Sequence, residues 1–115
     1  MEKITILGGS GFLGSALSDY LSKTNKFKIK IFDIKKKKKL KKNQIFILGN
    51  TLNIKKLEKA IKGSKYVFNF AALADLDISR DKPLETASVN IIGTINSLIV
   101  SKKYSVKKFI QASSI

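Results

Sequence analysis

The sequence predicts an α/β domain in which parallel strands form a doubly wound sheet covered by helices on both faces. Short apolar runs of strand length alternate with segments of helical period, a glycine-rich turn follows the first run, and no repeat or linker divides the 115 residues. With 43% apolar and 27% charged residues, the composition is that of a globular protein. One domain over residues 1–115 is therefore expected.

Five strands are expected from the apolar runs. The first run is nearly all apolar and ends at Gly8, which is typical of a strand buried on both faces. The second alternates apolar residues with Lys28 and Lys30, so one of its faces meets solvent near its start. In chain order, the expected strands are residues 4–7, 27–33, 45–48, 66–72 and 106–112.

Three helices are expected between these strands, because apolar residues recur at intervals of three and four and so form a stripe on one helix face. The second helix is short and closes at Gly63, a plausible C-terminal cap. The longest begins beside Pro83, and its stripe is expected to face the core. The stripes are Leu13, Leu17, Tyr20 and Leu21; Ile54, Leu57 and Ile61; and Leu84, Ala87, Ile91, Ile95 and Leu98, widened by Ile92 and Ile99.

Ligands of doubly wound sheets bind where the carboxyl ends of the strands meet. That edge should carry Gly8, Asp33, Gly49, Ala71 and Ser113.

The segment 8–14, Gly-Gly-Ser-Gly-Phe-Leu-Gly, joins a strand to a helix as in dinucleotide-binding proteins. Gly8 permits the tight turn, Gly11 lets the backbone approach a pyrophosphate, and Gly14 allows the helix to pack closely on the sheet. The helix N-terminus offers N–H groups and a positive dipole to the diphosphate, and Asp33 can accept hydrogen bonds from an adenosine ribose. A plain glycine turn without a ligand is the alternative.

The formal net charge of +15 comes from 23 basic residues against 8 acidic ones. Arg80 is the only arginine, although arginine is the residue best suited to bidentate contacts with phosphate and guanine. We therefore expect solvated lysines and no specific nucleic-acid partner, a basic nucleic-acid-binding protein being the alternative. The lysine-rich segment 35–42 is expected to be an exposed loop or frayed helix, because like charges repel; a phosphate or polyanion site is the other reading.

The chain contains no His and no Cys, which excludes a Ser-His-Asp triad, a cysteine nucleophile and a thiolate or imidazole zinc site within it. No metal is expected. Asp75 and Asp77 are more simply loop or helix-cap residues than a carboxylate pair. The longest uncharged stretch, residues 86–101, falls short of the ~18 apolar residues of a membrane span, so no membrane partner and a cytoplasmic location are expected.

The glycine spacing G-x-x-G-x-x-G resembles that of the short-chain dehydrogenase/reductase superfamily, and more narrowly its extended branch, the NAD-dependent epimerases and dehydratases acting on nucleotide sugars. Residues 67–72, Val-Phe-Asn-Phe-Ala-Ala, are similar to the family's fourth strand, usually V-F-H-L-A-A. Pro83-Leu84-Glu85 and then Asn90-Ile91-Ile92-Gly93-Thr94 match its following helix, and residues 108–114 resemble its fifth strand, which ends in the catalytic Ser or Thr. The resemblance covers essentially the whole chain.

The resemblance implies a Rossmann-type sheet of order 3-2-1-4-5 that stops after the fifth strand, so that residues 1–115 are an incomplete, N-terminal NAD(P)-binding domain. The full-length form would transfer hydride to and from its bound cofactor, act on a nucleotide sugar and form a possible homodimer. NAD is expected rather than NADP, because Asp33 repels a 2′-phosphate; Lys35 and its neighbours would soften that repulsion.

The resemblance also assigns roles to residues. Phe12 and Leu13 would lie over the pyrophosphate, Asn90 would tie its helix to the cofactor-side loop, and Ser114 would be catalytic, bonding the sugar hydroxyl or keto oxygen. Asn50-Thr51 replaces the usual Asp and aliphatic residue at the adenine, where an Asn amide can still bond. The implied cofactor contacts are Gly8, Gly11, Phe12, Leu13, Gly14, Asp33, Asn50, Thr51, Phe70, Ala71, Ala72 and Asn90.

The family's Tyr-x-x-x-Lys pair should follow the fifth strand, and the sequence stops at Ile115 before it. The chain alone is therefore expected to be inactive. Tyr104 and Lys108 have the right spacing but precede that strand, so we expect Tyr104 to pack its helix and the lysines to lie in solvent. A non-catalytic dinucleotide-binding sensor or partner-binding module is the alternative function, against which the position of Ser114 argues.

Overall fold

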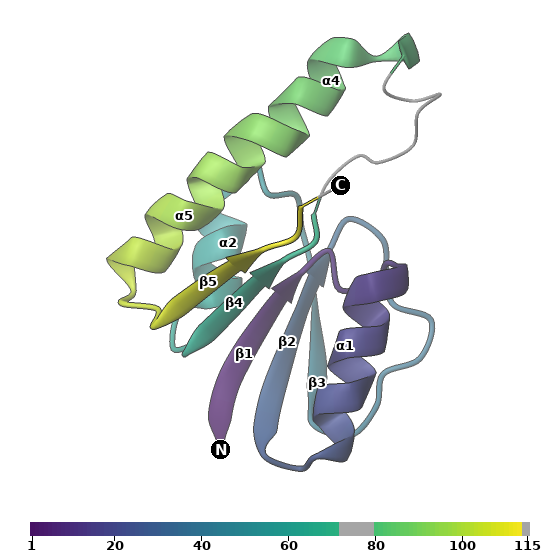
Figure 1. Cartoon of the computed structure of the whole chain (residues 1–115), viewed down its shortest axis with the longest axis vertical. Helices are drawn as coiled ribbons and strands as arrows, with labels where there is room; N and C mark the ends of the chain where they lie inside the picture. The colour runs from purple at the N-terminus through teal and green to yellow at the C-terminus, as the bar shows by residue number, and fades with distance from the viewer. Residues whose placement is uncertain (72–79, 114–115) are drawn as a thin grey trace.

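The computed structural model describes residues 1–71 and 80–113. Its five strands form one all-parallel sheet of order β3-β2-β1-β4-β5, with helices on both faces (Figure 1). The predicted fold class and strand order are confirmed. In chain order the elements are β1 (Glu2–Leu7), α1 (Phe12–Lys23), β2 (Phe27–Asp33), β3 (Gln44–Leu48), α2 (Ile54–Ile61), β4 (Tyr66–Asn69), α4 (Pro83–Ala87), the π-helix η1 (Ser88–Ile92), α5 (Gly93–Lys103) and β5 (Lys108–Gln111).

The direction of each crossover decides which face its helix covers. The crossover from β1 to β2 moves toward the β3 edge of the sheet, whereas the crossover from β4 to β5 moves toward the opposite edge. Because both crossovers are right-handed, α1 and α5 lie on opposite faces. Figure 1 shows this arrangement, and α2 packs beside α5. Each face of the central strands is therefore covered, which explains why β1 is buried from Ile4 to Leu7.

Alternate residues of the central strands feed two core layers. Facing α1, Ile4 and Ile6 pair in register with Ile29 and Ile31, and all four are buried. The opposite layer includes Leu7 and Phe32 from the sheet with residues of α2 and α5, namely Leu57, Ala60, Ile61 and Val100. Burying one such side chain contributes about 1.5–3 kcal/mol, so these layers supply most of the drive for folding.

The stripe predicted for α1 is only half correct. Leu17 and Leu21 pack against the isoleucine layer, but Leu13 and Tyr20 are 61% and 67% exposed. The buried positions of the helix are its small residues, Gly14, Ser18 and Ser22. These let the helix axis approach the sheet, so the apolar side chains flank the contact rather than fill it.

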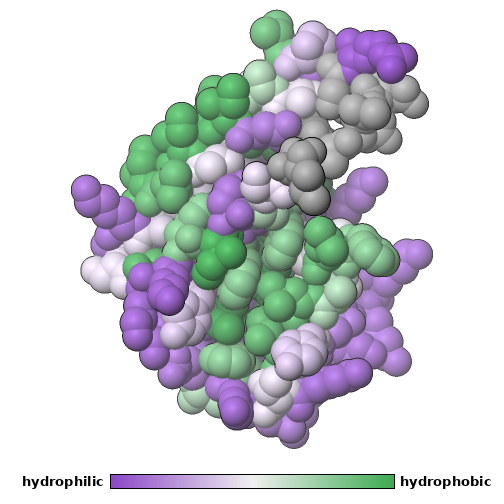
Figure 2. All heavy atoms as spheres, in the orientation of Figure 1, coloured by the Kyte–Doolittle hydropathy of each residue, from purple (hydrophilic) through white to green (hydrophobic). Residues whose placement is uncertain are grey.

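The face predicted for the longest helix is wrong. Segments α4, η1 and α5 form one continuous rod, and its buried residues are Gly93, Ser97, Val100 and Ser101. Every residue of the predicted stripe is exposed: Leu84, Ala87, Ile91, Ile92, Ile95, Leu98 and Ile99. Hydrophobic atoms accordingly cover the outer side of α5 in Figure 2. The spacing of the apolar residues correctly predicted a helix. As in α1, however, its small residues form the face that contacts the rest of the fold.

The short helix α2 ends as predicted. Leu57 and Ile61 are buried, and Gly63 follows the cap residue Lys62 with a φ of +84°, a left-handed conformation that glycine adopts without a steric penalty. At the other end, the Asn53 side chain accepts a hydrogen bond from Lys56 N at 3.1 Å. This N-cap was not predicted.

The lysine-rich segment is a loop between β2 and β3, as expected, but not all of it is solvated. Lys37 is only 6% exposed, and its Nζ donates to Asp19 Oδ1 of α1 at 3.0 Å. Gln44 donates to the same oxygen at 2.9 Å. The expectation that these lysines cannot pack is therefore wrong for Lys37, because a carboxylate on the neighbouring helix compensates its charge.

The last two strands of the chain, β4 and β5, are shorter than predicted. β4 ends at Asn69 and β5 covers only Lys108–Gln111. The edge strand β5 leaves Ile110 39% exposed. Among the described residues, no helix combines the length and apolar character needed to cross a membrane.

Candidate dinucleotide-binding site

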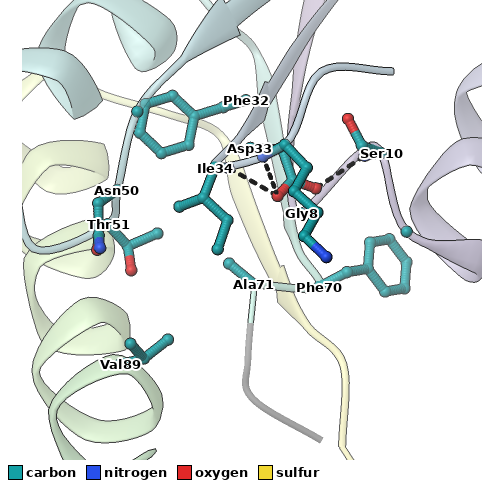
Figure 3. Close-up of a pocket in the computed structure, with 13 residues that line it drawn as sticks. Gly8, Ser10, Phe32, Asp33, Ile34, Asn50, Thr51, Phe70, Ala71 and Val89 are labelled. Carbon is teal, nitrogen blue, oxygen red and sulfur yellow. Dashed lines mark hydrogen bonds between the residues drawn. The ribbon is translucent and has the colours of Figure 1, made fainter. Parts of the chain in front are cut away.

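A pocket of about 260 Å³ lies at the carboxyl ends of the strands, the edge that the sequence predicted. In Figure 3, Thr51 and Val89 approach it from one side, Gly8 and Asp33 from the other, and Ala71 from the end of β4. Its complete lining is Gly8, Ser10, Gly11, Phe32, Asp33, Ile34, Lys35, Gly49, Asn50, Thr51, Phe70, Ala71 and Val89.

Gly8 makes the turn between β1 and α1 possible in two ways. Its φ is +75°, and an added Cβ would lie only 2.6 Å from the Phe70 carbonyl carbon and 2.7 Å from Ala71 N. Its N–H donates to Phe32 O at 2.7 Å, which ties the turn to β2. The chain therefore passes between the ends of β2 and β4 only with glycine at this position.

Gly11 and Gly14 occupy different surroundings within the same turn. A Cβ at Gly14 would overlap the Gly8 carbonyl oxygen and lie 2.8 Å from Gly9 Cα, so this glycine permits close packing of the helix on the turn. At Gly11 the nearest atom to an added Cβ is Gly8 O at 3.5 Å, an ordinary contact. Gly11 is exposed and has a φ of −73°, so packing within the chain does not require a glycine there.

Gly11 is also the N-cap of α1, and it supplies no side-chain cap to the first turn. No acidic side chain stands in that turn either. The first N–H groups of a helix lack intrahelical partners, and together with the helix dipole they attract an anion. The end of α1 is therefore arranged to receive negative charge from a ligand.

Asp33 ends β2 and is held in a fixed position by backbone amides. Its Oδ2 accepts from Ser10 N at 2.9 Å, and its Oδ1 accepts from Ile34 N at 2.7 Å (Figure 3). Each carboxylate oxygen has further lone pairs for hydroxyl donors. The glycine turn and the end of β2 thus place a carboxylate beside the start of α1.

The opposite wall comes from the loop after β3 and from the long helix. A Cβ at Gly93 would overlap Thr51 Oγ1 and lie 3.0 Å from Thr51 Cβ, and Asn96 donates to Thr51 O at 3.1 Å. Asn50 turns this loop by accepting from Leu52 N at 2.9 Å. The close approach of α5 to Thr51 is what brings Val89 to the pocket.

Asn69, where the family frequently has His, lies within the sheet rather than in the pocket lining. It is 1% exposed, donates to Gln111 Oε1 at 2.9 Å and accepts from Ala71 N at 3.0 Å. Its carbonyl also accepts from Ala112 N. Asn69 therefore holds the ends of β4 and β5 together and positions Ala71 at the floor of the site.

Seven of the predicted cofactor residues line the pocket: Gly8, Gly11, Asp33, Asn50, Thr51, Phe70 and Ala71. Gly14 lies behind the turn, Phe12 and Leu13 are 89% and 61% exposed on α1, and Asn90 is in η1, one residue beyond the lining residue Val89. Gly93 and Asn96 also join the long helix to the loop after β3, and the role of Asn90 stays a prediction. Ala72 and Ser114, and also Asp75 and Asp77, lie outside the described residues.

Nothing in the sequence indicated Phe32, Ile34 or Val89 as lining residues, whereas Ser10 was expected only as part of the glycine turn, Gly49 only at the edge of the sheet and Lys35 only near a 2′-phosphate. Ser10 and Gly49 could have been found from their places in the turn and at a strand end. Phe32 and Ile34 flank Asp33 directly, and Lys35 is two residues after it. Val89 reaches the pocket because the long helix contacts Thr51, and no sequence pattern indicated that contact.

Comparison with known proteins decides the family. The sequence model of the NAD dependent epimerase/dehydratase family matches residues 4–115. The chain belongs to this family. A UDP-glucose 4-epimerase of Rickettsia rickettsii is 32% identical over 98% of the chain, and a dTDP-D-glucose 4,6-dehydratase of Dictyostelium discoideum is 33% identical over 99%. The UDP-glucose 4-epimerase of Thermotoga maritima, solved with UDP-glucose, superimposes with a TM-score of 0.87 at 34% identity over 97% of the chain.

The chain spans about a third of the length of these family members. It covers 36% of the Rickettsia enzyme, 29% of the Dictyostelium enzyme and 38% of the Thermotoga structure. The relatives include both an epimerase and a dehydratase, so likeness over this part does not distinguish the two reactions.

Tyr104 and Lys108 do not form the family's Tyr-x-x-x-Lys pair. Tyr104 Oη donates to Glu58 Oε2 at 3.1 Å, and Lys103 Nζ donates to the same oxygen at 2.5 Å. Hydrogen bonds from Lys103 and Tyr104 lower the pKa of the Glu58 carboxyl below its ordinary value. The tyrosine thus joins α5 to α2 as expected, and Lys107 and Lys108 are exposed.

Proposed function

We propose that this chain is the NAD-binding part of a nucleotide-sugar epimerase or dehydratase. The observation that carries the proposal is the combination of an uncapped α1 N-terminus, an open Cβ position at Gly11 and a fixed Asp33 carboxylate around one pocket. A dinucleotide needs an anion site for its pyrophosphate and an acceptor for its ribose, and these residues supply both.

NAD bound there would accept a hydride from the sugar and later return it. Gly8 and Gly11 would keep the turn free of side chains at the pyrophosphate, Asp33 would accept from the adenosine ribose, and Asn50 and Thr51 would flank the adenine. The carboxylate disfavours a 2′-phosphate by charge repulsion, which supports NAD as the preferred cofactor.

Catalysis needs residues beyond this part. We propose Ser114 as the group that bonds the reacting sugar oxygen in the full-length form, with the Tyr-x-x-x-Lys pair and the substrate domain in sequence that follows. A nucleotide-sugar substrate is supported by the UDP-glucose of the Thermotoga relative. A non-catalytic dinucleotide sensor shares the same cofactor pocket and is the second candidate.

The test of the proposed ribose contact uses the adenosine half of the cofactor. Calorimetry of the 115-residue chain with ADP-ribose should show saturable binding, and Asp33→Asn should weaken it about tenfold, since hydrogen bonds to a charged group contribute about 1.5–3 kcal/mol. Asp81→Asn, which changes an exposed acid outside the pocket lining, is the control and should leave the dissociation constant unchanged. Equal affinities for wild type and Asp33→Asn would overturn the ribose assignment.

A further inference from the structure

A further pocket, of about 380 Å³, lies at the amino ends of β1, β2 and β3. This amino-end pocket is lined by residues that include Lys3, Lys28, Lys30, Asn43 and Ile45. The proposed nucleotide pocket lies at the carboxyl ends of the same strands, so the length of the sheet separates the two (Figure 1). Within the described part of the chain, the two pockets share no lining residue.

The three lysines of this pocket lie on one face of the sheet, beside the end of α2. Lys3 pairs in register with Lys28, and side chains two residues apart on a strand point to the same face, so Lys30 joins them. Lys30 Nζ donates to Lys62 O, at the C-cap of α2, at 2.8 Å. Lys3 Nζ lies near the same turn, 3.9 Å from the place where a Cβ on Gly63 would stand. Three positively charged side chains therefore lie side by side on this face.

These charges repel one another, and no carboxylate in the described lining offsets them. Burial lowers the pKa of the Lys30 ammonium below its ordinary value, and the positive charge of Lys3 lowers it further. Glu2, the neighbour of Lys3 in the chain, pairs instead with Lys65 Nζ at 2.9 Å. An anion in the pocket would replace the mutual repulsion of the lysines by attraction to a common charge.

The amino-end pocket also has an apolar wall. Ile45 pairs in register with Lys30 and so lies on the same face, where its side chain is 56% exposed. Farther along the same two strands, Phe32 and Ile47 are buried in the core layer that α2 covers. The sheet face is thus covered toward its carboxyl end and open at Ile45, beside the lysines. A ligand that combines an anionic group with an apolar body would contact both.

We propose that the amino-end pocket binds a small organic phosphate monoester, with the phosphate against Lys3, Lys28 and Lys30 and the organic part against Ile45. The phosphate of such a ligand carries about −1.5 to −2 units of charge at pH 7 and offers three acceptor oxygens, which suits several ammonium donors. The volume of the pocket falls within the range of small-molecule sites, about 300–1,000 Å³. Since the nucleotide pocket has different walls, binding here does not depend on the proposed function.

Phenyl phosphate is the probe, because it joins one phosphate to one apolar ring. Titration into the isotope-labelled 115-residue chain should give saturable NMR shifts at the backbone amides of Ile29 and Ile45, which belong to the pocket lining. The amides of Gly9 and Ser10 report separately on the glycine turn. Inorganic phosphate should shift the same pocket amides but bind at least about threefold more weakly, since it has no apolar part to bury against Ile45.

Two charge variants test the role of the lysines. Lys3→Gln with Lys28→Gln removes two charges from the pocket and leaves Lys30, which donates to the end of α2. At about 0.05 M salt this variant should bind phenyl phosphate about tenfold more weakly, and it should fold as stably as wild type because repelling charges are removed. The control, Lys55→Gln with Lys56→Gln, removes the same charge from exposed positions of α2 outside the pocket and should keep the affinity within about twofold.

Weaker binding by the Lys3/Lys28 variant, together with unchanged binding by the α2 control, supports the phosphate site. Equal affinity of wild type and the Lys3/Lys28 variant, an equal loss in the α2 control, or the absence of saturable shifts at Ile29 and Ile45 would overturn it. Equal affinities for phenyl phosphate and inorganic phosphate would overturn the contact with Ile45. NAD binding is measured in a separate titration, so the proposed function can fail while this site stands, and the reverse.

Discussion

Gly11 and Gly14 are three residues apart in one turn, yet packing within the chain requires a glycine only at Gly14. At Gly14 a side chain would collide with backbone atoms of Gly8 and Gly9. At Gly11 it would make only an ordinary contact, 3.5 Å from Gly8 O, and the backbone conformation there is also ordinary. Gly14 is thus required by the fold, whereas at Gly11 the absence of a side chain leaves space for a ligand.

The unfolding free energies of two alanine variants test this distinction. Gly14→Ala should lower the stability by about 1–3 kcal/mol, as overpacking does, even though alanine favours helix formation by up to about 1 kcal/mol. Gly11→Ala should remain within about 0.5 kcal/mol of wild type. Urea denaturation followed by circular dichroism measures both. Equal destabilisation of the two variants would contradict the separation of roles.

At the scale of elements, the site depends on how closely α5 approaches the loop after β3. Gly93 and Ser97 lie four residues apart on the buried face of the helix, and the loop presents Thr51 to that face. The exposed isoleucines of the helix take no part in this contact. Packing through small residues, rather than the apolar stripe, therefore fixes the wall that carries Val89.

A double-mutant cycle tests the Gly93–Thr51 contact. Gly93→Ala should cost about 1–3 kcal/mol of unfolding free energy, because the new methyl group overlaps Thr51 Oγ1. Thr51→Ala removes that atom, so the double variant should lose at least about 0.5 kcal/mol less than the sum of the single losses. If chemical denaturation shows that the loss in the double variant equals the sum of the two single losses, the cost of Gly93→Ala does not arise from its contact with Thr51.

The contact between α1 and the lysine loop carries a pH dependence. Partial burial by itself raises the pKa of the Asp19 carboxyl, but hydrogen bonds from Gln44 and Lys37, with the charges of Lys37 and Lys41, lower it below 3.8 overall. A carboxyl with a lowered folded-state pKa adds stability above its ordinary pKa. That contribution disappears as the pH falls through the lower, folded-state pKa.

Asp19→Asn removes this contribution and leaves Lys37 buried without its partner charge. At pH 7 the variant should lose about 1 kcal/mol of unfolding free energy, and the difference from wild type should shrink as the pH falls below about 4. Lys37→Met should cost less, since an apolar side chain tolerates the buried position. A stability difference between wild type and Asp19→Asn that stays constant from pH 7 to strongly acidic pH would contradict the linkage.

At the scale of the whole molecule, the parts that sequence predicts best are those set by local pattern. Alternating apolar runs and helical stripes predicted five parallel strands, the family resemblance predicted their order, and the glycine turn with Asp33 located the edge where the pocket lies. Which face a helix buries was not predictable from apolar residues alone, because Gly93, Ser97 and Ser101 bring α5 closer than Ile95 or Leu98 would allow.

Ion pairs between residues far apart in the chain also could not be predicted from the sequence. Nothing in the run of lysines marks Lys37 as the one that meets Asp19, because the two are 18 residues apart and are joined only when β2 and α1 pack. The pocket wall that contains Thr51 and Val89 likewise forms only when the long helix packs against the loop after β3. Pattern predicts the elements, whereas the contacts between elements decide which side chains reach the site.

Whether the turn from Gly8 to Gly14 binds a dinucleotide is measured by calorimetric titration of NAD into the folded 115-residue chain and into its Gly11→Ala variant. We expect saturable one-to-one binding by wild type. In Gly11→Ala the affinity should fall at least about tenfold, which corresponds to about 1.4 kcal/mol, with no loss of folding stability. Absence of saturable binding by the folded wild-type chain, or equal affinity in the variant, would contradict the claim that the turn from Gly8 to Gly14 is a dinucleotide site.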